Sequence, residues 1–573
     1  MMIRNIEIVF ILLLSFPVAA TDYYVSSSGG SGAGTKDDPW SLNHANAQLK
    51  AGDTAILRGG TYTKDIIAPA RSGSSDSNRI TYIAYSGEVP KFRPSSKMSS
   101  PFALKGRSYI TIDGIDVDGG GVYKDSKYDN WIHYDNTSHT ILKNSRLVHS
   151  KGYSAFRFQN KSSYNQIIDN YIDYNGTWNV KPWNNVYDDS GSMMWIYPGN
   201  DHNLIQGNTI KRSGHDLGII QGSYNVIRYN YYDNFWETYQ GSSFSFKNAS
   251  IAKGDKVGNR TISLKEGKKN VVEYNIFANV GESVDDSGVG IMKVGGTEQI
   301  VRRNIFFNGT GKGEGIASSV GSSSTIIQDN RIYNNTFYKI GGPAFWVNSY
   351  ASKWPAPKGH VFKNNIVYQA RLKETSSSMG VDVSFDKSLS KYHGNAFLDS
   401  EISHNCIAND AGASTAHAAT KGPDKLTAYE ADHPEVFFDN IQQPPYFESD
   451  QPAKREDFIL SSSSPCKDTA GDLTTTAASG SGKVVKVKDA SYFTDGNGLM
   501  DGDMIYVGSE QVMVKSVDTG ANQLTVDRSI NWADNDPVNL AVLDKKPDIG
   551  AVELESGLSP PAKPVITSIK AIR

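Results

Sequence analysis

The feature that most constrains this chain is a short phrase that recurs along most of its length. Each copy is a run of β-branched residues, then an asparagine, then a second apolar pair. The copies are centred on Asn144, Asn170, Asn208, Asn230, Asn275, Asn304, Asn330, Asn364 and Asn405. The steps between these asparagines run from 22 to 45 residues, with several between 22 and 29. That is the length of one coil of a solenoid.

A unit this short cannot bury its apolar face alone, so it must stack on copies of itself. Because the apolar runs are β-branched and lack helical spacing, the stack predicts a parallel β-helix. One asparagine per coil can occupy a bend and hydrogen-bond through its side-chain amide to the equivalent asparagine of the next coil. The residues two positions before the asparagine alternate in charge, and we interpret them as an outward, salt-bridged column: Gln206, Arg228, Glu273, Arg302 and Gln328.

The first twenty residues predict a secretory signal. A basic Arg4 precedes a short apolar run that ends in small residues, with cleavage expected after Ala20. The run is too short to span a bilayer, and no later segment approaches the necessary length. We therefore expect a secreted or periplasmic bacterial protein. In that oxidising setting Cys406 and Cys466 either form one disulfide or remain as buried thiols, and the sequence leaves both open.

The charge balance argues against a nucleic-acid partner. The formal net charge is −3, the pI is about 6.4, and the sequence contains no basic block. Phosphate binding needs concentrated Lys and Arg. We expect a monomer with no membrane span and no nucleic-acid partner.

The domain organisation follows from composition and turn signals. Residues 21–474 are expected to form the β-helix, with a short helix through Leu49, opened by Pro39 and Ser41, that caps its N-terminal end. Residues 475–545 alternate like strands between Asp-Gly and Gly-Asn turns, which predicts a small inserted antiparallel β domain. Residues 546–555 would then form a final β-helix strand and 556–573 a flexible tail. The predicted fold class is all-β.

The N-terminal strands at 51–62, 80–85 and 109–115, separated by glycine turns, carry a family resemblance, as does the ending at 547–553. Over roughly residues 23–553 the chain resembles secreted bacterial right-handed parallel β-helix proteins of the pectate-lyase-like superfamily. In character it is most similar to polysaccharide lyases acting on uronic-acid polymers such as alginate or glycosaminoglycans, and to the related C5-epimerases. In those lyases a Lys base and an Arg from neighbouring coils work beside calcium held by acidic side chains.

One predicted column lies just before a turn in successive coils. Its expected members are Gln159, Tyr197, Gln221, Lys265 and Lys293. Lys265 and Lys293 would then lie about 5 Å apart, by the spacing of neighbouring strands. Two ammonium groups so close favour the loss of one proton, and a neutral Lys can act as a general base. We therefore predict Lys265 as the base and Lys293 as the partner of the substrate carboxylate, the alternative being two solvated lysines.

Acidic pairs and one histidine form a second constellation. Asp188 and Asp189, and likewise Asp285 and Asp286, each precede a Ser-Gly turn. On stacked coils these carboxylates could hold Ca²⁺ through oxygen ligands or divide into acid and base, although turns alone also explain them.

His215, beside Asp216, suits proton transfer at neutral pH, and it matches part of the Asp-Pro-His-Asp pattern of the epimerases. The alternative for His215 is a structural histidine.

Two insertions, at 177–200 and 235–268, are expected to wall a groove, because insertions in a solenoid emerge on one side. The residues expected to contact a polysaccharide there are Trp195, Tyr197, Gln221, Trp236 and Lys247. The favoured hypothesis is a uronate polysaccharide lyase. A glycoside hydrolase or C5-epimerase, resting on the acidic pairs and His215, is the first alternative. A non-catalytic carbohydrate-binding β-helix is the second.

Overall fold

The structure is a computed structural model. It describes residues 20–93, 100–119, 130–149, 154–173, 192–213, 216–233, 235–236, 244–246, 249–251, 257–258, 262–279, 291–309, 315–320, 326–340, 344–349, 357–370, 381–383, 400–408, 416–417, 430–431, 434–542 and 546–553. The predicted signal segment up to residue 19 and the predicted tail at 556–573 lie outside these ranges. Within them, no helix has the length and hydrophobicity that a membrane crossing needs.

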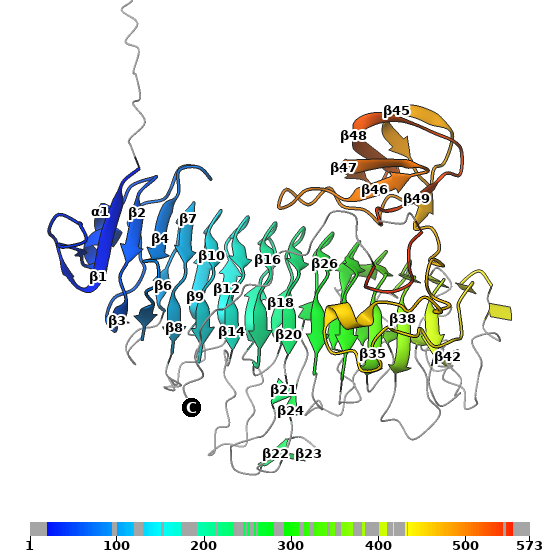
Figure 1. Ribbon diagram of the computed structural model, residues 1–573, viewed down its shortest axis with the longest axis horizontal. Coiled ribbons are helices and arrows are strands. Elements are labelled where there is room, and N and C mark those ends of the chain that lie inside the picture. The colour runs from blue at the N-terminus through cyan, green and yellow to red at the C-terminus, as the bar shows by residue number, and fades with distance from the viewer. Residues whose placement is uncertain are drawn as a thin grey trace, which may run out of the picture.

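The described chain winds into a parallel β-helix with three long sheets, which run side by side along the molecule (Figure 1). Sheet A comprises β1 (Asp22–Gly30), β2 (Thr54–Leu57), β4 (Ile80–Ala84), β7 (Ile110–Asp113), β10 (Ile141–Lys143), β13 (Gln166–Ile168), β16 (Leu204–Gln206), β19 (Val226–Arg228), β26 (Val271–Glu273), β30 (Ile300–Arg302), β34 (Arg331–Tyr333), β37 (Val361–Lys363), β40 (Glu401–Ser403) and β43 (Phe437–Phe438). Sheet B comprises β3 (Gly60–Tyr62), β5 (Pro90–Phe92), β8 (Asp116–Asp118), β11 (Arg146–Val148), β14 (Tyr171–Asp173), β17 (Thr209–Lys211), β20 (Tyr231–Asp233), β27 (Ile276–Ala278), β31 (Ile305–Phe307), β35 (Thr336–Ile340), β38 (Ile366–Ala370) and β41 (Cys406–Ala408).

Sheet C carries the candidate site described below. It comprises β6 (Phe102–Ala103), β9 (Asn130–Asp135), β12 (Ser154–Gln159), β15 (Ser192–Ile196), β18 (Gly218–Ile220), β25 (Ile262–Leu264), β28 (Met292–Val294), β32 (Ile316–Val320), β36 (Phe345–Ser349), β39 (Val381–Val383) and β42 (Ala416–His417). The described chain also forms three separate two-stranded sheets: β21 (Phe235–Trp236) with β24 (Val257–Gly258), β22 (Phe244–Phe246) with β23 (Ala249–Ile251), and β29 (Gly296–Thr297) with β33 (Ile327–Gln328). The predicted parallel β-helix is confirmed.

The interior of the coils is a continuous apolar core that runs from Val25 to Phe437. Equivalent residues of successive coils stack on one another, as Phe277 does on Phe306, with ring centroids 4.8 Å apart. Fully burying one such side chain stabilises the fold by ~1.5–3 kcal/mol.

Two asparagine ladders flank sheet A, the first where the chain enters its strands and the second at the corner between sheets A and B. The first contains Asn165, Asn203, Asn225, Asn270, Gln299 and Asn330, and the second Asn170, Asn208, Asn230, Asn275, Asn304, Asn335, Asn365, Asn405 and Asn440. Asn304 Oδ1, for example, accepts from both the backbone N (2.9 Å) and the Nδ2 (3.0 Å) of Asn275. The predicted amide-to-amide bonding is confirmed.

The predicted ladder register is wrong in three coils. Ser145 and Asn365 occupy the second ladder where Asn144 and Asn364 were expected, because Asn144 and Asn364 sit one residue earlier at positive φ (51° and 55°). Asparagine tolerates that left-handed conformation better than most residues. Asn330 belongs to the first ladder, so the charge column continues from Arg302 to Tyr333, and Gln328 is not part of it.

The N-terminal end is closed by helix α1 (Leu42–Gln48). The hydroxyl of Ser41 caps it by accepting from the backbone N of His44 at 3.2 Å, and Leu42 and Ala45 are buried against the first coil. Near the other end, Cys406 of β41 forms a disulfide with Cys466, which follows the 3-10 helix η1 (Arg455–Phe458), and their Cα–Cα distance of 6.1 Å is within the ordinary range.

The inserted β domain is a six-stranded antiparallel sheet, which we call the barrel. Its strands are β44 (Thr474–Thr475), β45 (Gly480–Lys486), β46 (Met504–Val507), β47 (Glu510–Asp518), β48 (Gln523–Trp532) and β49 (Pro537–Leu540). It stands on the outer face of sheet A (Figure 1), where Val226, Val271 and Ile300 share one apolar cluster with the barrel core. Residues 546–553 then return to the β-helix without forming the predicted final strand.

The charged column of sheet A is salt-bridged as predicted, but the barrel covers it. Arg228, Glu273 and Arg302 are in register, and the Glu273 carboxylate lies 3.2 Å from Arg228 Nε and 2.7 Å from Arg302 Nη2. Burial raises the pKa of Glu273, but the two guanidinium groups outweigh burial and hold that pKa below its usual value.

Candidate functional site

The outward face of sheet C carries most of the described candidate residues. In β12 only Arg157 and Gln159 are partly exposed, and in β15 only Trp195 is. Because side chains alternate across a strand and the intervening residues are buried in the core, these three side chains point away from the coil interior.

Strand pairing sets two outward columns. In the first, Arg157 lies between His133 and Trp195, and the column continues through Ile219 and Ser263 to Lys293. The second column lies two residues later in each coil and contains Gln159, Tyr197, Gln221 and Lys265. The backbone N–H groups of Tyr197, Gln221 and Lys265 each donate a hydrogen bond of 2.8–3.1 Å to the preceding coil.

The prediction that Lys293 shares a column with Lys265 is wrong. Lys293 pairs with Ser263, and the position beside Lys265 is taken by Gly295, whose N donates to Leu264 O at 2.6 Å. The apolar residues set the register, since Met292 pairs with Ile262 and Val294 with Leu264. The two lysines are therefore diagonal neighbours on adjacent coils, roughly 8 Å apart at the backbone by strand spacing and rise.

Five side chains from four coils form a continuous group, which we call the cationic-aromatic patch: Arg157, Trp195, Tyr197, Gln221 and Lys265. Trp195 Nε1 donates to Gln221 Oε1 at 2.7 Å, and the Trp195 and Tyr197 rings stack with centroids 4.9 Å apart. The guanidinium of Arg157 lies 5.0 Å from the Tyr197 ring, and Lys265 Nζ lies 5.7 Å from the Trp195 ring. Cation–π contacts of this length hold both cations against the aromatic pair.

Arg157 and His133 are candidate residues that the sequence reasoning missed. Among the described residues, Arg157 Nε and His133 Nε2 are buried polar atoms without a hydrogen-bond partner, and the two residues are adjacent in register. Burial lowers the pKa of His133, and the nearby Arg157 contributes in the same direction. A buried donor left unpaired costs about 1–3 kcal/mol, so such atoms mark a place where a ligand can complete the bonding.

Asp135 borders this pair. Its carboxylate accepts from Asn160 Nδ2 at 2.7 Å and lies 3.0 Å from Lys105 Nζ. Burial acts to raise the pKa of Asp135, but these two donors outweigh it and lower that pKa. Asp135 is therefore an ionised, already paired carboxylate.

Asp216, a predicted catalytic residue, is fully buried. Its Oδ2 accepts from Ser263 Oγ at 2.9 Å, and its backbone carbonyl accepts from Met193 N at 2.9 Å. These bonds tie β15, β18 and β25 together.

The remaining predicted residues cannot be placed in the site. His215, Lys247, Asp188, Asp189, Asp285 and Asp286 lie outside the described residues. The backbone of Trp236 pairs with Val257 in β21 and β24, away from the three long sheets. Within the described ranges, no group of three or more His, Cys, Asp or Glu side chains could hold a metal ion.

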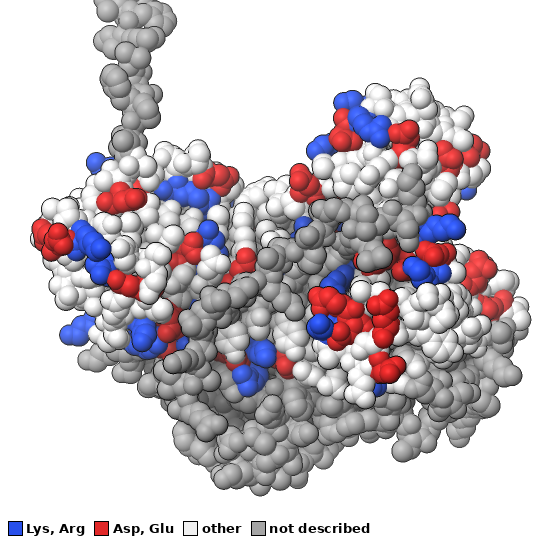
Figure 2. Space-filling model, in the orientation of Figure 1, with Lys and Arg blue, Asp and Glu red and all other residues white. Residues whose placement is uncertain are grey.

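The charges on the face seen in Figure 2 are interspersed. Lys and Arg alternate with Asp and Glu in small groups over both the β-helix and the barrel. On this face the pattern agrees with the small net charge of −3.

Comparison with solved structures finds similar β-helical enzymes at low identity. The alginate lyase AlyGC is 14% identical, with 79% of this chain and 58% of that chain covered and a TM-score of 0.44. The pectate lyase Pel9A is 16% identical, with 81% and 94% covered and a TM-score of 0.42. The family 6 polysaccharide lyase Pedsa3628 from Pseudopedobacter saltans is 16% identical, with 73% and 97% covered and a TM-score of 0.39. The chain thus spans less than two thirds of AlyGC, and no curated protein matches it.

A family model gives the assignment. The model described as "Pel9A-like, right handed beta helix region" matches residues 23–335, more than half of the chain. The matched region contains sheet C from β6 to β32 and every residue of the cationic-aromatic patch. The chain belongs to the Pel9A-like right-handed β-helix family.

Proposed function

We propose that this protein is a polysaccharide lyase that cleaves a uronic-acid polymer by β-elimination. The observation that carries the proposal is the cationic-aromatic patch, which places Arg157 beside Tyr197 and Lys265 beside Trp195 around two stacked aromatic rings on an outward face. Family membership and the polysaccharide lyases among the similar structures support the same substrate class.

The reaction removes the proton at C5 of a uronate. The side-chain nitrogen of Lys265 takes this proton, the electron pair forms the C4–C5 double bond, and the C4–O bond breaks, with the leaving oxygen taking up a proton from water. Lys265 is the proposed base because its side-chain nitrogen lies beside the aromatic pair, 5.7 Å from the centre of the Trp195 ring.

Elimination also requires the adjacent carboxylate to be neutralised, since charge builds up on it as the proton leaves. Arg157 is the proposed partner, because its Nε is an unpaired donor and a guanidinium can bind a carboxylate through two parallel hydrogen bonds. Lys293, on the coil after that of Lys265, adds a second lysine on the same outward face.

Two alternatives remain proposals of lower rank. A hydrolase or C5-epimerase would depend on His215 and the acidic pairs, which lie outside the described residues. In the described part of sheet C, Asp135 is already paired and Asp216 is buried, so neither is available as half of a carboxylate pair. A non-catalytic carbohydrate-binding role would use the same aromatic rings.

The test is a substrate screen with two readouts. Purified protein is incubated with alginate, glycosaminoglycans, pectins and neutral glycans, and both ultraviolet absorbance of the unsaturated product and new reducing ends are measured. A lyase gives both signals on a uronate polymer. Reducing ends without absorbance would replace the proposal with a hydrolase, and binding without either signal would replace it with a carbohydrate-binding protein.

A further inference from the structure

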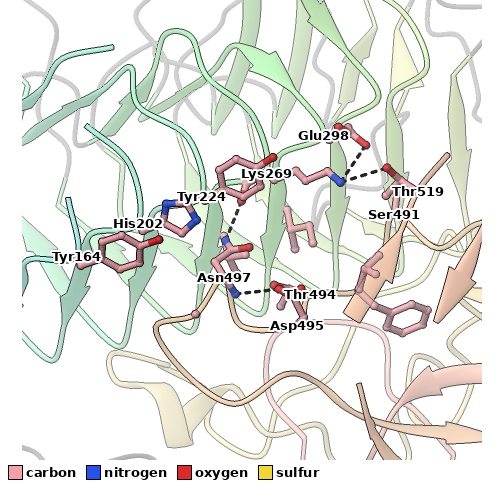
Figure 3. A pocket seen from close by; sticks show the side chains of 15 residues that line it. Tyr164, His202, Tyr224, Lys269, Glu298, Ser491, Thr494, Asp495, Asn497 and Thr519 are labelled. Carbon is pink, nitrogen blue, oxygen red and sulfur yellow. Dashed lines mark hydrogen bonds and ion pairs between the residues drawn. The ribbon is translucent and has the colours of Figure 1, made fainter. Parts of the chain in front are cut away.

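A second candidate site lies at the junction of the β-helix and the barrel. A cavity of about 410 Å³ is enclosed between the turns that enter sheet A and the barrel loop at residues 491–498 (Figure 3). Ligand pockets in proteins usually measure about 300–1,000 Å³, so this cavity is large enough for a small ligand or one end of a longer one. None of its lining residues belongs to the cationic-aromatic patch.

One wall of the cavity is a column of turn residues, which we call the turn ladder. From the N-terminal side its members at the cavity are Tyr164, His202, Tyr224, Lys269 and Glu298. Each has a positive φ between 53° and 60° and immediately precedes a residue of the first asparagine ladder. They lie one per coil, so the ladder repeats at the strand spacing of about 4.8 Å, close to the length of one hexopyranose unit in an extended chain.

The rings of the ladder stack on one another. Tyr164 and His202 have centroids 4.9 Å apart, and His202 and Tyr224 5.0 Å. The stack continues away from the cavity to His139 and Tyr109. Since neighbouring rings cover each other's faces, what they offer to a ligand is their edges, with the tyrosine hydroxyls and histidine nitrogens.

The opposite wall comes from the barrel. Asn497 Nδ2 donates to Lys269 O at 3.0 Å, which fixes the loop over the ladder, and the Asn497 backbone N donates to Asp495 Oδ1 at 3.0 Å. Thr494 and Ser491 line the same side. Figure 3 shows these side chains and the ladder around one space.

The lining of this space carries one lysine and two carboxylates. Lys269 Nζ lies 3.8 Å from Glu298 and donates to Thr519 Oγ1 at 3.2 Å, so its charge is engaged. Asp495 adds a second carboxylate to the lining. A uronate or phosphate would meet two carboxylates and one neutralised lysine, whereas an uncharged hydroxyl-rich ligand meets donors and acceptors on both walls.

We propose that the cavity binds a neutral oligosaccharide segment, with the turn ladder on one side and the 491–498 loop on the other. This goes beyond the proposed function, because the ligand is not turned over here and carries no uronate. Two sites in one chain raise the effective concentration, at the second site, of a polysaccharide that carries both uronate and neutral segments.

The experiment is isothermal titration calorimetry on the full chain carrying Lys265→Met, which keeps any uronate probe intact. The probes are cellohexaose, xylohexaose, mannohexaose and a mannuronate hexasaccharide. The cavity variants are His202→Ala and Tyr224→Phe, the second of which keeps the ring stack and removes only the hydroxyl. The matched control is His139→Ala, which lies in the same ladder outside the cavity, and thermal melts check folding.

At least one neutral hexasaccharide should bind. Its Kd should rise about tenfold with each cavity variant, the loss expected for one hydrogen bond, and should stay within about twofold with His139→Ala. The proposal is overturned if no neutral probe binds at millimolar concentration, or if His139→Ala weakens binding as much as the cavity variants do. Tighter, cavity-dependent binding of the mannuronate probe would overturn the neutral ligand class. Binding heat does not depend on turnover, so these outcomes are distinct from failure of the lyase assay.

Discussion

Arg302 of the β-helix and Asp503 of the barrel form a two-pronged ion pair, with guanidinium nitrogens 2.8 and 2.5 Å from the two carboxylate oxygens. Their side chains are only 3% and 7% exposed. Arg302 also donates to Tyr333 OH at 3.0 Å, and Tyr333 OH donates to the barrel carbonyl of Tyr492 at 2.6 Å. This network fixes the barrel on the coils and so defines the shape of the cavity between them.

Replacing Arg302 by Met should destabilise the protein strongly, because it leaves Asp503 buried without its counter-charge. Breaking a buried pair by removing one partner typically costs about 3–5 kcal/mol. The measurement is unfolding in guanidinium chloride. The control is Arg528→Met in the barrel, whose pair with Glu510 is 51% and 42% exposed and should cost less than about 1 kcal/mol. Equal losses in the two variants would contradict the importance of the buried network.

Replacing Lys265 by Met should reduce kcat on the identified uronate polymer by about 10²–10⁴, the usual loss for a positioned base. Lys293→Met is the matched control, since it removes the same charge one coil away and should act mainly through KM. Initial rates of ultraviolet absorbance give both constants. If both lysine variants keep near-wild-type turnover, Lys265 is not the base.

Replacing Arg157 tests the carboxylate contact. Arg157→Gln should raise KM and lower kcat together, because a guanidinium that pairs with the carboxylate stabilises it increasingly as charge develops. Arg157→Lys keeps the charge but not the two parallel hydrogen bonds, so it should recover only part of the loss. Full recovery with Lys would show that charge alone matters at this position.

His360 should make the fold sensitive to acid. Complete burial, helped by the nearby Arg331, lowers its pKa to about 3, from 6.5 for an exposed histidine. The unfolded chain therefore binds a proton that the folded chain excludes, so stability falls as the pH drops from about 6.5 towards 3. Near pH 4.5 the loss should reach about 2–3 kcal/mol. In urea unfolding across this window, His360→Asn should show a correspondingly shallower decline, and an identical slope would contradict this account.

We propose that activity depends on Ca²⁺, because the predicted ligands Asp188, Asp189, Asp285 and Asp286 carry the carboxylate oxygens that this ion prefers. We expect chelation to reduce activity, added Ca²⁺ to restore it, and Asp189→Asn or Asp286→Asn to raise the Ca²⁺ concentration required. Activity and melting temperature are measured against free Ca²⁺. Full activity and an unchanged melting temperature after chelation would assign these residues to turns or proton transfer instead.

The sequence predicted the coils because the β-branched runs and the asparagines are local signals that each coil repeats. It did not predict the register everywhere, because asparagine serves two purposes: Asn144 and Asn364 satisfy a left-handed turn, and Ser145 and Asn365 beside them carry the ladder. A residue type alone cannot separate these two uses.

The candidate site shows the same division. The sequence predicts Trp195, Tyr197, Gln221 and Lys265 as site residues, and they form one group in the structure because Trp195 is next to last in its sheet C strand and the other three directly follow theirs. The predicted column aligned Lys293 with Lys265. The apolar residues set a different register, in which Met292 and Val294 pair with Ile262 and Leu264, so Lys293 lies beside Ser263. Arg157 was missed, although its place two residues before Gln159 in an alternating strand was a usable signal.

The two asparagine ladders stay five residues apart in coil after coil, as in Asn203 and Asn208 or Asn270 and Asn275, while the step from one coil to the next varies between 22 and 45 residues. A residue inserted between the two ladders of one coil would break the ladder hydrogen bonds of that coil to the coils before and after it. A residue inserted before or after a strand of sheet C would break none of these hydrogen bonds. Selection can therefore lengthen, shorten or exchange the segments that flank the candidate site without disturbing the frame. Such a protein can acquire a new polysaccharide specificity at little risk to its folding.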